Sequence, residues 1–211
     1  MGAAVDRDKA RPGQEAVPEQ ALDVLFRSAR SQNGWTDAPV SEAQVRAIYE
    51  LLRWGPTSAN CSPARFIFVM SASAKARLRP HLEASNVAKA MAAPVTVIIG
   101  YDRHFHEHLP YLFPHNPAAP GWFAGEHRKD HAETTAFRNG TLQAGYMILA
   151  ARAVGLDCGP MSGFDRDGVD REFWNGTAVR TNFLCGLGRG DPGKLFPRHP
   201  RLAFEQCCSI V

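Results

Sequence analysis

A long helical stretch at residues 132–154, which ends at Gly155, constrains the fold more than any other feature of the sequence. Apolar residues occur around most of its circumference rather than along one stripe. A helix of this kind must be covered on several sides, so we expect it to lie at the centre of the fold. The chain has 211 residues, enough for one sizeable core and few for two.

Other segments predict a small sheet and further helices around this stretch. Runs rich in β-branched or aromatic residues predict three strands, at residues 65–70, 94–101 and 178–187. Apolar residues at helical spacing predict four more helices, at residues 21–30, 45–52, 74–82 and 165–174. The proline-rich residues 104–125 predict an excursion from the core, and a loop is expected from Gly159. The order of these elements indicates one α+β domain.

Composition and the chain ends exclude several classes of protein. Residues 1–19 are polar, so we expect a flexible N-terminal arm ahead of a single domain at residues 20–211. No apolar run approaches the roughly 18 residues that span a bilayer, and charges stand where a signal peptide needs apolar residues. Lys plus Arg number 24 and Asp plus Glu 21, which gives a net charge of +3, and the two signs are interspersed. We therefore expect no membrane and no nucleic-acid partner.

The cysteines and histidines bear on location and on metal binding. The five cysteines are odd in number and form no C-x-x-C pair, so we expect a reducing cytoplasm and no disulfide framework. Six of the eight histidines lie within residues 104–131, which leaves open a metal site or solvated imidazoles at the rim of a pocket. Alternating histidines on an extended loop need not converge, and no acidic or cysteine partner has the usual spacing. We expect no bound metal ion.

The segment WGPTSANCSPAR, at residues 54–65, carries the strongest indication of a binding site. Pro56 follows the end of a helix, and Thr57, Ser58 and Asn60 offer hydroxyl and amide groups just before a buried strand. Such groups on a tight turn suit a polar ring system or a phosphate. Turns rich in serine and asparagine are also common connectors, so the segment alone leaves both interpretations open.

Together with other strings, this segment resembles the nitroreductase family of FMN-dependent oxidoreductases. The resemblance covers about residues 22–205, in the order of the family's elements. The strings ARSQNGW, LLRWGPTSANCSPARF, AAPVT, TAFRN, GLDCGPMSGFD, LGRGD and PRLAFE are most similar to the subgroup that contains the malonic semialdehyde reductase of bacterial uracil catabolism. The resemblance implies a nitroreductase-like α+β fold, with a mostly antiparallel central sheet flanked by helices, and a homodimer whose two FMN sites are each lined by both chains.

The resemblance also implies which residues bind the cofactor. The implied contacts are Arg30, Ser31, Asn33, Pro56, Thr57, Ser58, Asn60, Asn86, Lys89, Pro160, Met161, Ser162, Gly163 and Arg201. Thr57, Ser58 and Asn60 would come from the partner chain, and backbone groups of residues 160–163 would face flavin N5. A cation such as Lys89 stabilises the negative charge of a reduced flavin, and an arginine such as Arg201 suits a phosphate. Alternatively, Lys89 is a solvated surface ammonium, and Arg201 only steadies the tail.

The sequence departs from the family pattern at four positions. Ala29 stands where many members have a phosphate-binding arginine, Ala203 where they have a second C-terminal cation, and Asn33 where they have Arg or Lys. Ser162 stands where several members have Glu. Arg27 and Arg198 are the candidates for the missing phosphate charge.

The resemblance predicts an FMN-dependent NAD(P)H oxidoreductase that reduces malonic semialdehyde to 3-hydroxypropionate by ping-pong hydride transfer through flavin N5. Trp122 and Phe123 either line the acceptor pocket or belong to the core. A cation for the acceptor's carboxylate would be Arg65, Arg138 or a histidine of residues 104–131. The alternatives are a broad NAD(P)H reductase of quinones and nitro compounds, a flavin carrier without turnover, and a histidine-rich metal-binding module.

Overall fold

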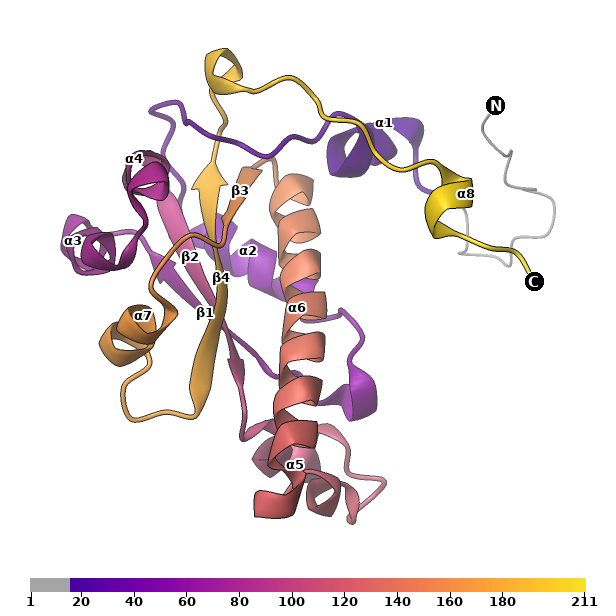
Figure 1. Cartoon of the computed structure of the whole chain (residues 1–211). Coiled ribbons are helices and arrows are strands. Elements are labelled where there is room, and N and C mark those ends of the chain that lie inside the picture. Colours follow the sequence, from indigo (N-terminus) through magenta and orange to yellow (C-terminus); the bar gives the residue numbers. More distant parts are fainter. Residues whose placement is uncertain (1–15) are drawn as a thin grey trace.

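A four-stranded antiparallel sheet organises the chain, with its strands in the order β1-β2-β4-β3 (Figure 1). The computed structural model describes residues 16–211. The strands are β1 (Ala64–Val69), β2 (Val95–Asp102), β3 (Asp157–Met161) and β4 (Val179–Gly188). Since β2 and β4 lie in the middle, β1 and β3 form the two edges.

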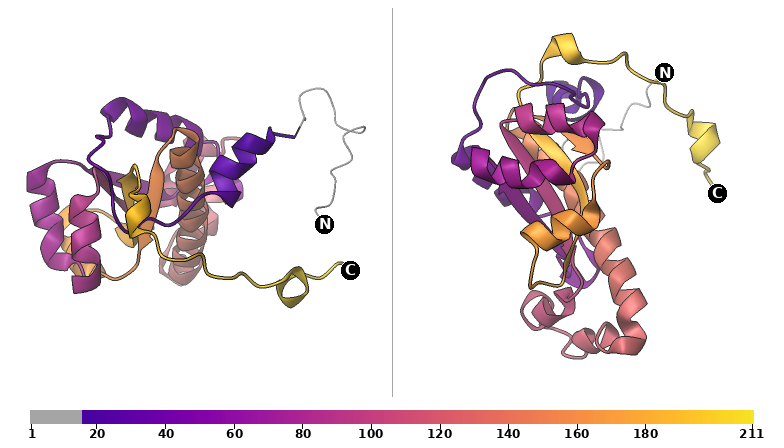
Figure 2. Two further views of the ribbon diagram at one scale, coloured as in Figure 1. Left: turned by 90° about the horizontal axis from the view of Figure 1, so that it is seen from above. Right: turned by 60° about the vertical axis from the view of Figure 1, so that its left-hand side comes forward.

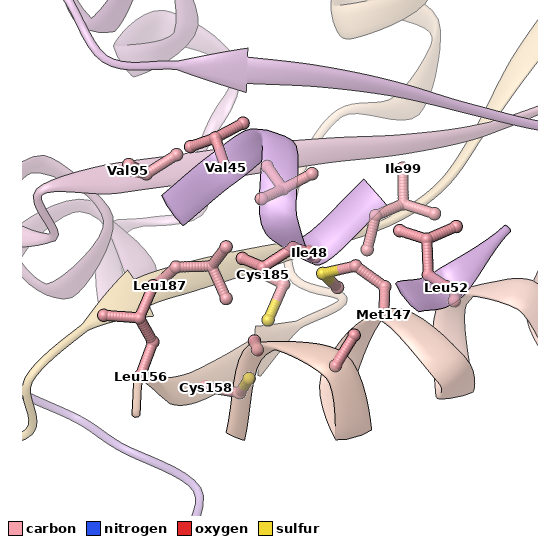
Figure 3. Close-up of a cluster of buried hydrophobic side chains, with 14 of the residues drawn as sticks. Val45, Ile48, Leu52, Val95, Ile99, Met147, Leu156, Cys158, Cys185 and Leu187 are labelled. Carbon is pink, nitrogen blue, oxygen red and sulfur yellow. The ribbon is translucent and has the colours of Figure 1, made fainter. Parts of the chain in front are cut away.

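Helices cover both faces of this sheet (Figure 1). One face carries α2 (Glu42–Leu52) and α6 (Lys129–Ala153), and their apolar side chains meet those of the sheet in the cluster drawn in Figure 3. The other face carries α3 (Ala72–Leu78), α4 (Ala84–Ala92) and α7 (Arg166–Phe173). The remaining α-helices are single turns, namely α1 (Glu19–Leu22), α5 (Leu109–Leu112) and α8 (Phe204–Cys207).

The predicted long helix is α6, and it lies against the sheet as expected. Gly140 lets it approach β2 closely, because a Cβ at this position would lie 2.9 Å from the Cβ of Tyr101. Three apolar side chains of α6 are nevertheless not covered by this chain: Phe137, Leu142 and Tyr146 keep 45%, 41% and 38% of their surface exposed. Leu142 and Tyr146 stand one turn apart and share one side of the helix, whereas Phe137 lies on another side.

Two predictions of local structure are wrong, and one helix was not predicted. Gly159 and Pro160 belong to β3 rather than to a loop, and an edge strand tolerates the missing N–H of proline. Residues 84–92 form α4, which the sequence did not indicate because few apolar residues stand among small and polar ones. The predicted helix at 21–30 is a short α1 followed by a π-helical turn at Asp23–Arg27.

The C-terminal tail extends beyond the layered body (Figure 2). Residues 1–15 of the predicted arm lie outside the described residues, and Glu19 already begins α1. After β4 the tail runs away from the sheet and ends beyond α8 (Figure 2). Of the helices in residues 16–211, none combines the length and the hydrophobicity that crossing a membrane would require.

The packing of α6 predicts the cost of a cavity at its centre. Met147 is fully buried in the cluster of α2, α6 and the sheet, whereas Met70 is 37% exposed. We expect Met147→Ala to lower the free energy of unfolding by about 2–5 kcal/mol, measured by urea denaturation. Met70→Ala is the matched control and should cost less than about 1 kcal/mol. Equal losses in the two variants would contradict this picture of the core.

Candidate functional site

A pocket of about 500 Å³ forms where the C-terminal tail crosses the segment that follows α1. Its lining includes Phe26, Ala29, Arg30, Ser31, Asn33, Arg152, Phe196, Pro197, Arg198, His199 and Arg201. Four of the predicted cofactor contacts thus lie in one pocket, although Arg201 is far from the other three in the sequence. We call it the arginine pocket.

The arginine pocket holds four guanidinium groups and no carboxylate among its described lining residues. Each of these arginines donates only to backbone carbonyls: Arg30 to Phe196, Arg152 to Leu25, Arg198 to Arg27 and Ala29, and Arg201 to His199 and Pro200. Within residues 16–211 none of the four forms an ion pair. Uncompensated positive charge of this kind favours a multiply charged anion, and planar guanidinium groups favour a phosphate.

Of the two candidates for the missing phosphate charge, only Arg198 lies in this pocket. Arg27 instead pairs with Glu19 and, at 3.3 Å, with Asp23, and it does not line this pocket. Arg152 was missed, because it stands in the last turn of α6, where a basic residue is ordinary.

The segment after Ser31 connects the arginine pocket to α4. The N–H of Gln32 donates to the carbonyl of Cys158 in β3 at 2.9 Å, and Trp35 Nε1 donates to the carbonyl of Lys89 at 2.9 Å. Gln32 is buried against Gly190, whereas its neighbours Ser31 and Asn33 line the pocket. This alternation is that of an extended segment, and it places Ser31 and Asn33 on the side where a ligand could lie.

Two of the predicted cofactor contacts, Asn86 on α4 and Gly163 after β3, touch each other. The buried Asn86 donates through Nδ2 to the carbonyl of Gly163 at 2.8 Å, which fixes the loop after β3. Lys89 follows one turn later on α4 and is half-buried, and this burial lowers the pKa of its ammonium. Among residues 160–163, Met161 points into the core, so only its backbone is available to a ligand.

The turn at residues 56–60 lies elsewhere in the same chain. The N–H of Ser58 donates to Asn139 Oδ1 at 2.9 Å, and Asn60 Nδ2 donates to the carbonyl of Leu112 at 2.8 Å. Asn139 and Arg152 stand thirteen residues apart on α6, which is about 20 Å along a helix. One chain therefore does not bring this turn to the arginine pocket.

The backbone of this turn is held in an uncommon conformation. Ala59, Asn60 and Ser62 have φ values of 49°, 49° and 38°, in the left-handed region that few residues other than glycine adopt. Burial raises the pKa of the Cys61 thiol to about 11, so it stays protonated at neutral pH and is no nucleophile. Strained turns persist where surrounding contacts hold them, and here α5 and α6 supply those contacts.

The excursion at residues 104–131 surrounds a second pocket of about 460 Å³. Phe123 is buried and stacks on His131 at 5.2 Å, so it belongs to the core, although one side of it lines this pocket. Trp122 keeps 41% of its surface exposed. The pocket's charges pair with one another, as Lys129 with Glu126 at 3.2 Å, and in residues 16–211 no three His, Cys, Asp or Glu side chains are grouped to hold a metal ion.

Comparison with known proteins identifies the family. Residues 26–189 match the model of the Nitroreductase family. The chain is 58% identical over 192 residues, 91% of this chain and 98% of the relative, to a protein of Cupriavidus pinatubonensis that bears the provisional name NADH dehydrogenase/NAD(P)H nitroreductase. A protein of Ralstonia pickettii with the same provisional name is 59% identical over 191 residues, 90% of this chain and 97% of the relative. The chain belongs to the nitroreductase family.

Solved structures confirm the predicted nitroreductase-like α+β fold. A protein of Bacillus subtilis with the provisional name nitroreductase superposes with a TM-score of 0.77 at 18% identity, covering 91% of this chain and 99% of its own. A protein of Exiguobacterium sibiricum with the same provisional name, solved in complex with FMN, superposes with a TM-score of 0.76 at 18% identity, covering 94% of this chain and 99% of its own. At this identity the likeness concerns the fold alone.

The burial of Lys89 predicts a pH dependence of stability. Its pKa is lowered in the folded chain but is about 10.4 in the unfolded chain. Between these two values the unfolded state binds the extra proton, so the stability of the folded state rises with pH. We expect the flavin-free wild type to gain thermal stability relative to Lys89→Met as the pH rises from neutral toward about 10.4. A difference between the two melting temperatures that does not change with pH would contradict this.

Proposed function

We propose that the chain is an FMN-dependent NAD(P)H oxidoreductase with one flavin-binding domain at residues 20–211. The observation that carries this proposal is the arginine pocket, which has four guanidinium groups, no carboxylate in its described lining and a volume of about 500 Å³. From it an extended segment leads to the half-buried cation of Lys89. FMN has the matching chemistry, with a phosphate at one end and a polar ring that becomes anionic on reduction at the other.

Each group of residues has a distinct task in this proposal. Arg30 and Arg201 hold the phosphate, and Ser31 and Asn33 line the path from it. Asn86 and Lys89 serve the pyrimidine end of the ring, where the Lys89 ammonium offsets negative charge. The backbone of residues 160–163 faces flavin N5, with Ser162 exposed and Gly163 fixed by Asn86. When bound, FMN supplies hydride chemistry, accepting a hydride from NAD(P)H and donating one to the acceptor.

We further propose that two copies of the chain share each site. The turn formed by Pro56, Thr57, Ser58 and Asn60 lies about 20 Å along α6 from the arginine pocket, so a partner has to supply it. The exposed Leu142 and Tyr146, one turn apart on α6, give such a partner an apolar surface to bury. The five thiols, all free in the structure, suit the reducing cytoplasm.

As acceptor we propose malonic semialdehyde, on the strength of the sequence strings that resemble its reductase. Its carboxylate needs a cation. Arg65 is already bound to Asp102 at 2.7 Å, whereas Arg138 has neither an ion pair nor a hydrogen bond among the described residues. Arg138 is also exposed on α6, next to Phe137 in the sequence, and is therefore the better candidate. The exposed Trp122 remains the candidate for a wall of the acceptor site, in preference to the buried Phe123.

A second candidate function is the reduction of nitro compounds or quinones. The provisional names of the relatives from Cupriavidus pinatubonensis and Ralstonia pickettii favour a nitro acceptor. One flavin face can reduce an aldehyde, a quinone or a nitro group, so the cofactor site does not discriminate among them.

The visible spectrum of the purified protein tests the cofactor, and two acceptors test the substrate. We expect a flavin spectrum that bleaches with NADH or NADPH and recovers on addition of malonic semialdehyde, with kcat/KM about tenfold or more above that for a nitrofuran. A large preference for the nitrofuran would favour the second function. Colourless protein that binds no added FMN would contradict both, and stoichiometric zinc in it would favour the histidine-rich module instead.

Disruption of the exposed α6 face tests the shared site. We expect Leu142→Glu to convert the dimer to a monomer in analytical ultracentrifugation and to weaken FMN binding about tenfold or more, because a buried charge opposes association and the partner's turn is lost. Met70→Glu, which places the same charge on an exposed methionine outside α6, is the control and should stay dimeric. A monomeric Leu142→Glu that binds FMN as tightly as the wild type would overturn the shared site.

A further inference from the structure

Arg152 lines the arginine pocket and is the one arginine of its described lining that stands on the long helix α6. It stands in the last turn of α6, whereas Arg198 and Arg201 belong to the C-terminal tail. Ala29 lines the same pocket. The pocket thus contains Ala29, where many family members have an arginine, together with Arg152 from α6.

The contacts of Arg152 hold it in place and leave most of its donors free. Its Nη1 donates to the carbonyl of Leu25 at 2.8 Å, and the side chain is half-buried between α6 and the turn after α1. A guanidinium has five N–H donors, and no carboxylate within the described chain pairs with this one. An arginine that is anchored at one nitrogen and unpaired at the others is preorganised for an anion.

Arg198 has a different set of contacts, although it also lines the pocket. Its Nη2 donates to the carbonyls of Arg27 and Ala29 at 2.9 and 3.0 Å. These bonds tie the tail to the backbone at Ala29. Arg198 therefore fixes the tail at the pocket, whereas Arg152 reaches the pocket from the helix α6.

We propose that Arg152 binds the phosphate of the flavin and supplies the charge that Ala29 lacks. This inference rests on the proposed function, since it concerns the ligand of the same site. Arg152 then acts together with Arg30 and Arg201, so that side chains from three elements surround the phosphate dianion. The competing explanation is structural, because an arginine in the last turn of a helix also stabilises that helix and here holds Leu25.

Comparison of FMN with riboflavin, which lacks the phosphate, separates the two explanations. Dissociation constants are measured on flavin-stripped protein by quenching of flavin fluorescence. We expect Arg152→Gln to raise the dissociation constant of FMN about tenfold or more, as loss of a charged hydrogen bond would, and to change that of riboflavin less than about twofold. Glutamine keeps a donor for the carbonyl of Leu25.

Two further variants sharpen the test. Ala29→Arg in the Arg152→Gln background should restore FMN affinity to within about threefold of the wild type, because the charge returns to the same pocket from its other wall. Arg46→Gln is the matched control, since Arg46 is exposed on α2 and pairs with Glu42, and it should leave both flavin affinities unchanged. Melting temperatures of the flavin-free variants show whether each one folds.

The outcomes distinguish this inference from the proposed function. If Arg152→Gln weakens FMN and riboflavin equally, or weakens neither, Arg152 does not bind the phosphate and the inference is overturned. If Arg152→Gln fails to fold, Arg152→Lys replaces it, and an FMN affinity that falls no more relative to riboflavin affinity than it does in Arg46→Gln overturns the inference. If the wild type binds neither flavin, the proposed function itself fails.

Discussion

The packing of α6 on the sheet is the constraint on which the rest of the structure depends. Gly140 allows the helix to approach β2, and Met147 fills the space between the helix, α2 and the sheet. Two buried polar side chains of the same helix hold the strained turn and the start of β1: Asn139 accepts from the N–H of Ser58, and Gln143 from that of Ala64, both at 2.9 Å. The last turn of α6 carries Arg152 to the arginine pocket. One rigid element thus positions both parts of the candidate site.

The two pockets described above differ in whether their charged side chains are paired. In the excursion at residues 104–131 the charged side chains neutralise one another, as Lys129 does with Glu126. In the arginine pocket the guanidinium groups donate only to carbonyls, so their charge remains uncompensated. Holding like charges together without a counterion costs stability, which is offset only when an anion binds. This difference, more than size, distinguishes the candidate cofactor site, because the two pockets have similar volumes of about 460 and 500 Å³.

Much of the fold could be predicted from the sequence, because strong local patterns decided it. Residues 45–52 have helical spacing after a capping box, and the structure shows Ser41 and Gln44 exchanging both bonds of that box. The run at 94–101 is rich in β-branched residues and corresponds to β2, one of the two inner strands. The predictions failed where the local pattern was weak or contradicted by its context. Pro160 lies in an edge strand, which tolerates a proline. The apolar contacts of α4 form only in the folded chain, where Ala90 packs in a cluster with residues of the sheet and of other helices.

The sequence by itself determined the helices and strands with strong periodicity, the family, and the types of residue available to a phosphate and a flavin ring. Only the tertiary structure decided which of those residues meet. It brings Arg152 beside Arg30 and Arg201, removes Arg27 from the pocket, and separates Ser58 from all of them. The physical reason is that periodicity depends on neighbours a few residues apart. Distances between charges on different elements instead depend on how α6, the tail and the sheet pack together.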